Sequence, residues 1–167
     1  MGYINSCKEE GLRAHTVEAY DPHSQRMREI FDEYDKQCQR EGVVDFAELL
    51  LRCYELLGRD ANIREHYQSR FRYILVDEFQ DTSYTQFALL QRLTAGWEAD
   101  EEGALGRSLF LVGDPMQSIY RFRQAAVGLF LRARAHGLGD LRLHPLRLSV
   151  NFRSSPGIVD WVNRSFK

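Results

Sequence analysis

The chain is poor in the features that mark exported, membrane-spanning and zinc-binding proteins. It contains no apolar run long enough to span a bilayer, and its N-terminus lacks the charged-then-apolar layout of a signal peptide. Its three cysteines are an odd number without a C-x-x-C pair, which indicates reduced thiols and argues against a zinc site. It also has no internal repeat and no low-complexity tract. We therefore expect a cytoplasmic protein.

The composition that remains is that of a soluble globular protein. Hydrophobic residues make up 44% and charged residues 28% of the 167 positions, a length that suits one domain or one domain with part of another. The formal net charge is −2, yet residues 107–167 hold ten Lys and Arg against three Asp and Glu. This basic segment is either a set of solvated helix faces or a surface suited to phosphate groups.

Residues 1–70 have the pattern of helices. The dipeptide Asp21-Pro22 predicts a helix start, and Gly42 predicts the end of that helix. Asp45 predicts the capped start of a second helix, which Gly58 is expected to end. Five apolar residues at helical spacing mark the core face expected of this second helix, namely Phe46, Leu49, Leu50, Cys53 and Leu57.

From residue 71 the pattern changes to strands that alternate with helices. The expected elements are strand 72–77, helix 83–95, strand 108–112, helix 124–136, strand 143–150 and a helix opened by Ser155-Pro156. Strand 72–77 is a continuous apolar run, which predicts a buried, parallel strand. Ser83 and Gln86 can form a capping box at the start of the helix that follows. The alternating order predicts an α/β fold with an open parallel sheet.

Polar residues follow each of the three expected strands. The strands lead into "VDEFQD", "VGDPMQSIYRFR" and "LSVNFRSS", and the carboxyl ends of parallel strands share one edge of a sheet. Asp77 and Glu78 form a Walker B pattern, in which the Asp holds Mg²⁺ through its water shell and the Glu deprotonates an attacking water. Mg²⁺ would also supply the positive charge that crowded carboxylates need. The alternative is an acidic turn in which Asp81 or Thr82 caps the next helix.

Two further side chains suit phosphoryl transfer. Gln117 can hydrogen-bond a terminal phosphate and Arg153 can stabilise the charge that develops on it, although a turn amide and a surface cation are the simpler interpretations. The aromatic residues beside them are Tyr120, Phe122 and Phe152. These rings suit a core or, with Arg121 and Arg123 interleaved, a platform on which bases of single-stranded nucleic acid stack.

Three segments together resemble a known family. "ILVDEFQDT", "LFLVGDPMQSIYRFRQA" and "LSVNFRSSP", in this order and at this spacing, resemble motifs II, III and IV of superfamily 1 DNA helicases of the UvrD/Rep/RecB kind. The resemblance implies part of a P-loop NTPase (RecA-like) parallel sheet preceded by a helical segment. It also implies an ATP-dependent DNA helicase or translocase of DNA repair or recombination, which couples ATP hydrolysis to movement on single-stranded DNA. The implied cofactors are ATP and Mg, and the implied partners are single-stranded DNA and the remaining helicase domains or partner subunits.

The resemblance also implies a role for each matching residue. Asp77 would coordinate Mg²⁺, Glu78 would be the catalytic base, Gln80 would help connect the nucleotide site with the DNA site, and Gln117 would sense the γ-phosphate. Arg153 would contact the γ-phosphate from the second motor lobe, and Phe152 would pack on the adenine. Tyr120, Phe122 and Arg123 would form the DNA site, where relatives often carry Trp at the position of Phe122.

One family motif has no counterpart in the chain. Nothing fits G-x-x-x-x-G-K-[ST], the backbone cradle and lysine that hold the phosphates. The expected organisation is a middle slice of a helicase: 1–58 as the end of a helical insertion, 59–138 as the later part of the first RecA-like motor lobe, and 139–167 as the start of the second. We expect no ATP hydrolysis by this chain alone. The alternatives are a non-catalytic module that binds single-stranded DNA or a partner, and an inactive truncated helicase.

Overall fold

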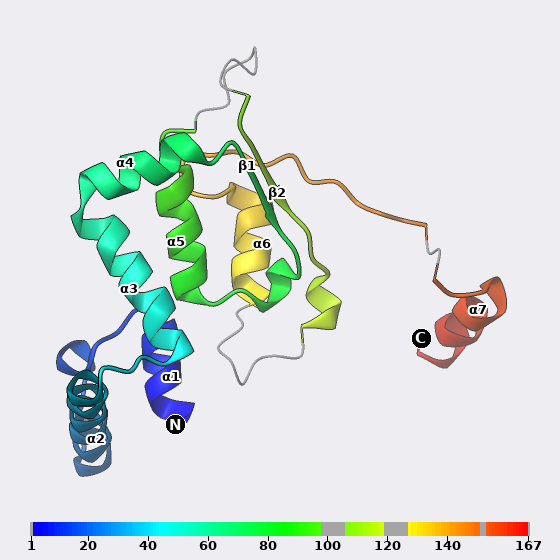
Figure 1. The fold of residues 1–167 in the computed structure, drawn as a ribbon. Coiled ribbons are helices and arrows are strands. Elements are labelled where there is room, and N and C mark those ends of the chain that lie inside the picture. The colour runs from blue at the N-terminus through cyan, green and yellow to red at the C-terminus, as the bar shows by residue number, and fades with distance from the viewer. Residues whose placement is uncertain (1, 98–105, 119–126, 151–152, 167) are drawn as a thin grey trace.

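The fold combines helices with a two-stranded parallel sheet, as a computed structural model shows for residues 2–97, 106–118, 127–150 and 153–166 (Figure 1). Its helices are α1 (Gly2–Glu9), α2 (Pro22–Glu41), α3 (Phe46–Arg59), α4 (Ala61–Arg70), α5 (Tyr84–Thr94), α6 (Val127–His136) and α7 (Pro156–Ser165). The strands are β1 (Tyr73–Val76) and β2 (Ser108–Leu111), and the 3₁₀ turns are η1 (Ala14–Thr16), η2 (Phe79–Asp81) and η3 (Pro115–Gln117). This order confirms the α/β class.

The predicted caps of α2 and α5 are confirmed. The Asp21 carboxylate accepts hydrogen bonds from the first backbone N–H groups of α2, and Gly42 ends that helix with a φ of 67°. Such a left-handed backbone suits glycine, which has no Cβ to clash. Ser83 and Gln86 form the expected capping box at the start of α5. Local sequence signals therefore decide where these two helices begin, and where α2 ends.

Gly58 does not end α3, contrary to the sequence expectation. The helix continues to Arg59, and Asp60 then caps the N-terminus of α4 by accepting the Ile63 N–H at 3.0 Å. A Cβ at Gly58 would collide with the guanidinium of Arg92, which reaches across from α5. The glycine therefore serves close packing between two helices rather than helix termination.

The core face predicted for α3 is also wrong. Phe46 is 89% exposed and Leu49 and Cys53 are exposed as well, so of the five predicted residues only Leu57 is buried. The buried residues of α3 are Ala47, Glu48, Leu51 and Leu57. The helix is turned so that the Glu48 carboxylate faces inward, where it meets the ammonium group of Lys8 at 3.0 Å.

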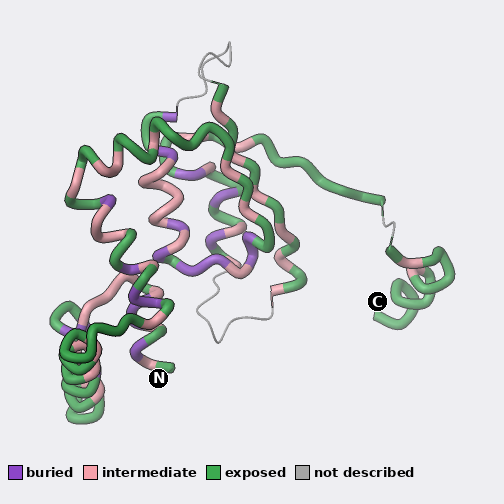
Figure 2. The backbone as a smooth tube through the Cα atoms, in the orientation of Figure 1, coloured by how far each residue is buried: buried purple, intermediate pink, exposed green. Residues whose placement is uncertain are grey.

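The two strands are parallel neighbours, as the sequence predicts. Tyr73 pairs with Ser108, and the register continues to Val76 opposite Leu111. One face of the sheet packs on a core cluster made of Phe79, Phe87, Leu129, Ala133 and Leu138 (Figure 2). The other face is open, and Leu75 on it is 69% exposed. The expectation of a fully buried strand is therefore wrong for one face of β1.

No third strand forms over residues 143–150. This segment runs in extended form away from the sheet toward α7, and Leu148 within it is 93% exposed (Figure 1). A strand needs a neighbour for its backbone hydrogen bonds, and in the described part of the chain this segment has none. The apolar alternation of "LHPLRLSV" therefore does not bring it into the sheet.

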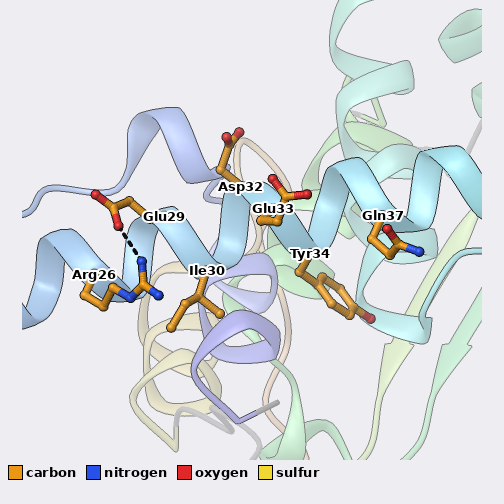
Figure 3. A pocket seen from close by; sticks show the side chains of 7 residues that line it. All are labelled: Arg26, Glu29, Ile30, Asp32, Glu33, Tyr34 and Gln37. Carbon is orange, nitrogen blue, oxygen red and sulfur yellow. Dashed lines mark hydrogen bonds and ion pairs between the residues drawn. The ribbon is translucent and has the colours of Figure 1, made fainter.

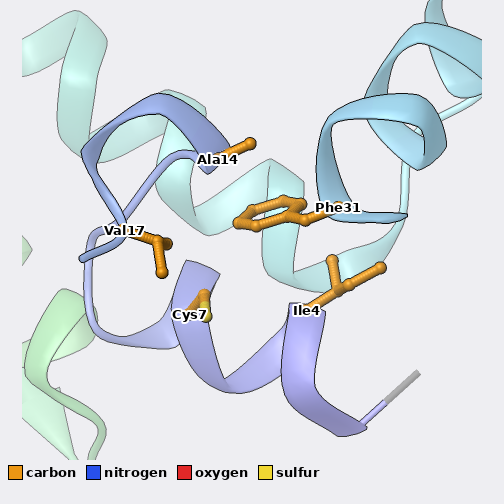
Figure 4. Close-up of a cluster of buried hydrophobic side chains, with 5 residues drawn as sticks. All are labelled: Ile4, Cys7, Ala14, Val17 and Phe31. Atoms are coloured by element: carbon orange, nitrogen blue, oxygen red, sulfur yellow. The ribbon is translucent and has the colours of Figure 1, made fainter. Parts of the chain in front are cut away.

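A second, smaller core holds the helical N-terminal part together. Its buried members are Ile4, Cys7, Ala14, Val17 and Phe31, from α1, η1 with the residue after it, and α2 (Figure 4). Among the described residues, no helix is both long enough and apolar enough to cross a membrane.

Candidate nucleotide-facing site

The two strands deliver their polar residues to one edge of the sheet. We call this edge, residues 77–82 and 113–118, the rim. The loops that form it are connected through the backbone, because Val112 donates to the Val76 carbonyl and Phe79 donates to the Val112 carbonyl, both at 2.8 Å. Asp77 and Gln117 therefore lie at the same end of the sheet, as the sequence predicts.

Glu78 is held in an unusual backbone conformation at the end of β1. Its φ is 50° and its ψ is 40°, and it is the one non-glycine residue with a positive φ in the described ranges. A left-handed non-glycine residue costs about 1–3 kcal/mol and persists only where its surroundings enforce it. In this turn the Glu78 N–H donates to Asp77 Oδ1 at 2.9 Å, and the next residue, Phe79, donates to the Val112 carbonyl. This turn leaves both carboxylates exposed to solvent.

Gln80 connects the two loops of the rim. Its side chain is inside the protein, with the residue 5% exposed, and its Oε1 accepts the Asp114 N–H at 3.0 Å. The Ser118 hydroxyl donates to the Gln80 carbonyl at 3.5 Å and to Asp81 Oδ1 at 3.1 Å. Gly113 leaves room for the hydrogen bond between Gln80 and Asp114, because a Cβ at position 113 would lie 2.6 Å from Gln80 Oε1. The amide of Gln80 therefore fixes the spacing of the two loops.

The side chain of Gln117 is positioned by Asp114. Gln117 Nε2 donates to Asp114 Oδ2 at 2.9 Å, and the Met116 N–H donates to Asp114 Oδ1 at 3.0 Å. These hydrogen bonds from Gln117 and Met116 lower the pKa of the Asp114 carboxyl below its ordinary value. The sequence predicts a turn through Gly113-Asp114-Pro115, but it does not predict the contacts of Asp114 with Gln117 or of Ser118 with Asp81.

The structure does not contain the alternative arrangement, in which Asp81 or Thr82 caps the helix after the acidic turn. Ser83, rather than Asp81 or Thr82, is the N-cap of α5. Asp81 instead accepts hydrogen bonds from Ser118 and from Gln80 Nε2, the latter at 3.4 Å. Capping of α5 therefore does not explain the acidic residues Asp77, Glu78 and Asp81.

Of the remaining predicted site residues, Arg153 alone lies in the described part of the chain. Tyr120, Phe122, Arg123 and Phe152 lie outside the described residues. Arg153 lies in the C-terminal segment that runs away from the sheet, so the expected convergence of three strand ends is reduced to two (Figure 1). The reason is the missing third strand, which was to carry Arg153 to the same edge.

The rim has the groups that Mg²⁺ binding would need. The described residues contain no group of three or more His, Cys, Asp or Glu side chains placed to hold a metal ion directly. Mg²⁺, however, keeps several of its waters and is held by one or two carboxylates together with substrate phosphates. Asp77 is exposed, so its carboxylate is open to a water-mediated contact of this kind.

One hollow of the described surface lies away from the rim. It is an open space of about 680 Å³ along α2, lined by Arg26, Glu29, Ile30, Asp32, Glu33, Tyr34 and Gln37 (Figure 3). Its charged residues pair with one another and with neighbours on the same helix, as Arg26 does with Glu29 at 2.9 Å and Lys36 with Asp32 at 2.6 Å. These pairs describe a solvated helix face, so we place the candidate site at the rim.

Comparison with known proteins gives a family and several long relatives. The family described as UvrD/REP helicase N-terminal domain matches residues 1–136. DNA helicase II of Escherichia coli (strain K12) is 41% identical over 165 residues, which is 98% of this chain and 21% of the relative. DNA helicase II of Haemophilus influenzae is 38% identical over 162 residues, covering 96% of this chain and 20% of the relative.

A second group of relatives carries a different name. An ATP-dependent helicase/nuclease subunit of Pelotomaculum thermopropionicum is 37% identical over 151 residues, which is 84% of this chain and 11% of that protein. The chain thus spans about a fifth of the DNA helicase II relatives and about a tenth of this helicase/nuclease protein.

Proposed function

The chain belongs to the family of the UvrD/REP helicase N-terminal domain, and from that membership we propose that it forms part of the motor of an ATP-dependent DNA helicase. The observation that carries the proposal is the rim, where the strained Asp77–Glu78 turn and the Asp114–Gln117 loop are joined through Gln80. Relatives named as helicases support the reaction class.

We assign the chemistry of the rim as follows. Asp77 would hold Mg²⁺, which when bound would neutralise charge on the nucleotide phosphates. Glu78 accepts the proton of the attacking water, and Gln117 contacts the terminal phosphate. Gln80 keeps these two groups at a fixed spacing, since it ties their loops together. In the same proposal Arg153 and Phe152 contact the γ-phosphate and the adenine from the second lobe, and Tyr120, Phe122 and Arg123 bind single-stranded DNA.

The proposal divides the chain into three parts. Residues 1–58 are the end of a helical insertion, 59–138 are the later part of the first motor lobe, and 139–167 are the start of the second lobe. The open face of β1 and β2 and the isolated position of α7 agree with such a division (Figure 1). Nothing in the chain matches the phosphate-cradle motif, so we expect the chain alone to hydrolyse ATP at the background rate.

A chimeric protein tests the proposal. This chain replaces the matching segment of E. coli DNA helicase II, and DNA unwinding and ATP hydrolysis are measured for the chimera and for its Glu78→Gln variant. We expect the variant to lose about 100-fold or more in ATP hydrolysis, since it loses the group that deprotonates the water.

Glu65→Gln is the matched control, because Glu65 is an exposed carboxylate on α4, outside the rim. It should leave hydrolysis within about twofold of the unaltered chimera. Equal loss in both variants, or full activity of Glu78→Gln, would show that Glu78 is not the base. DNA-stimulated hydrolysis by the isolated chain that vanishes in Glu78→Gln would refute the expected inactivity of the chain alone.

A further inference from the structure

Helix α2 is held to the rest of the molecule over a short part of its length. Its 20 residues extend for about 30 Å at the usual rise of 1.5 Å per residue, but Phe31 is its one buried residue. Figure 1 shows α2 beside α1, on the side of the molecule away from the sheet. A helix attached in this way can change its orientation if the attachment changes.

The polar part of the attachment is an ion cluster centred on Lys8. Lys8 belongs to α1 and is 1% exposed, and its Nζ lies 3.0 Å from Asp35 of α2. The same Nζ lies 2.9 Å from Asp45 and 3.0 Å from Glu48, at the start of α3. Arg13 also binds Glu48, at 2.8 Å. One buried ammonium group therefore connects three helices, and removing its charge would take the central cation from Asp35, Asp45 and Glu48. Arg13 and Arg52 would remain as the cations of the cluster, both bound to Glu48.

The backbone of the same lysine is held from the other side by α5. Thr85 is 2% exposed, and its Oγ1 lies 3.0 Å from the Lys8 carbonyl and 2.7 Å from the Glu9 carbonyl. These carbonyls are at the C-terminus of α1, where a helix cannot satisfy them by itself. Thr85 is in the first turn of α5, and two residues separate it from Thr82, the last residue of this loop of the rim.

We propose that Lys8 and Thr85 form a joint that couples the orientation of α2 to the conformation of the rim. The Lys8 side chain is bound to α2 through Asp35, so a movement of α2 displaces Lys8 and α1. A displacement of α1 is transmitted to α5 through the hydrogen bonds of Thr85. Both are positioning residues. The proposal rests on the proposed function only in treating the rim as the nucleotide-facing edge, since the coupling itself needs no nucleotide. Because coupling is reciprocal, disturbing either side must be felt at the other.

Hydrogen exchange of the full chain, without nucleotide or DNA, measures this coupling directly. Lys8→Met keeps much of the side-chain volume and removes the charge. We expect amides of α2 and rim amides such as those of Phe79 and Asp81 to exchange at least about tenfold faster in this variant. Lys36→Met is the matched control, because Lys36 pairs with Asp32 on the exposed side of α2, and it should leave the rim unchanged.

A second pair of variants tests the joint from the other side. Thr85→Val removes the hydroxyl at nearly constant volume, whereas Thr85→Ser retains it. Faster exchange in α2 for Thr85→Val, restored by Thr85→Ser, supports the joint, because α2 makes no hydrogen bond to Thr85 in the described structure. Equal exchange of α2 in these two variants would overturn the proposal.

The outcome for Lys8→Met is equally decisive. Faster exchange in α2 with an unchanged rim would show that the ion cluster anchors α2 without coupling, and would also overturn the proposal. Trp97 is buried near the end of α5, so a shift of its fluorescence reports unfolding of the part of the chain around α5. If Lys8→Met unfolds this part, the comparison of the two Thr85 variants decides.

Discussion

At the scale of single residues, the rim depends on a close fit between one side chain and one glycine. Gln80 can accept the Asp114 N–H only because Gly113 leaves its amide enough room. Glu78 is a second special residue of the rim, since its backbone is left-handed and its N–H donates to Asp77 Oδ1. Buried polar contacts of this kind are expensive to leave incomplete, so small changes in them have measurable effects.

Gly113→Ala tests this fit. The new Cβ would meet Gln80 Oε1 at 2.6 Å, so Gln80 must shift and lose its hydrogen bond. We expect the free energy of unfolding to fall by about 1–3 kcal/mol, measured by urea denaturation. Gly128→Ala is the control, because a Cβ there meets nothing within 4 Å and alanine favours the helix α6. Equal stability of the two variants would show that Gln80 is not constrained by Gly113.

At the scale of elements, α5 begins directly after one loop of the rim, and its cap fixes where the helix starts. Ser83 accepts the Gln86 N–H, and the Gln86 side chain in turn accepts the Ser83 N–H at 2.8 Å. Helix α5 then packs Phe87 into the core cluster beneath the sheet, so the cap lies between the rim and that cluster.

Ser83→Ala should destabilise the chain by about 1 kcal/mol, because the first-turn N–H groups of α5 lose their acceptor. Ser83→Gly should cost only a few tenths of a kcal/mol, since glycine lets backbone and solvent satisfy the same groups. Thermal unfolding followed by circular dichroism measures both. A larger loss for the glycine variant would contradict a capping role and indicate that the Ser83 side chain acts through packing.

The ion cluster around Lys8 makes the helical part sensitive to acid. Burial by itself raises the pKa of Asp45 and of Glu48, but hydrogen bonds from Lys8 to Asp45, and from Arg13, Arg52 and Lys8 to Glu48, outweigh it and lower both. A carboxyl whose pKa is lower in the folded state stabilises that state above its ordinary pKa. This contribution is lost as the pH falls through the folded pKa. The other polar groups facing the cluster are Tyr34, Asp35 and Glu55.

We therefore expect the urea midpoint of the unaltered chain to fall as the pH is lowered from about 5 to about 3, where carboxyls of this kind titrate. Lys8→Met should show a smaller fall, since its carboxylates have already lost the central cation. Lys36→Met should follow the unaltered chain, because its ion pair is exposed. Parallel pH dependence of the Lys8 variant and the unaltered chain would mean that acid acts elsewhere.

What the sequence could predict also depends on scale. Caps at Asp21, Ser83 and Gly42 were predictable because they depend on a few neighbouring residues. The orientation of α3 was not, because it depends on Glu48 meeting a lysine that lies far away in the sequence. The strand expected at 143–150 failed for a similar reason, since a strand exists only beside a partner. The rim was predictable because two parallel strands must end on one side.

At the scale of the whole molecule, the charged residues are distributed unevenly along the chain. Residues 107–167 hold ten basic and three acidic side chains, and they include the predicted DNA residues Tyr120, Phe122 and Arg123. Phosphate contacts supply binding that falls with salt, and ring stacking adds about 1–3 kcal/mol per base without regard to sequence. Two stacking rings and a modest excess of charge predict weak binding of single-stranded DNA.

Fluorescence anisotropy with a labelled single-stranded oligonucleotide tests this expectation. Affinity should fall as the salt concentration rises, and Phe122→Ala should raise the Kd by about tenfold at fixed salt, because one base loses its stacking partner. Phe166→Ala is the control, since Phe166 is an exposed aromatic residue at the end of α7 that has no predicted role in binding. If both variants bind like the unaltered chain, Phe122 belongs to a core rather than to the DNA site. If binding does not depend on salt, the basic segment does not contact phosphates, and its arginines are solvated.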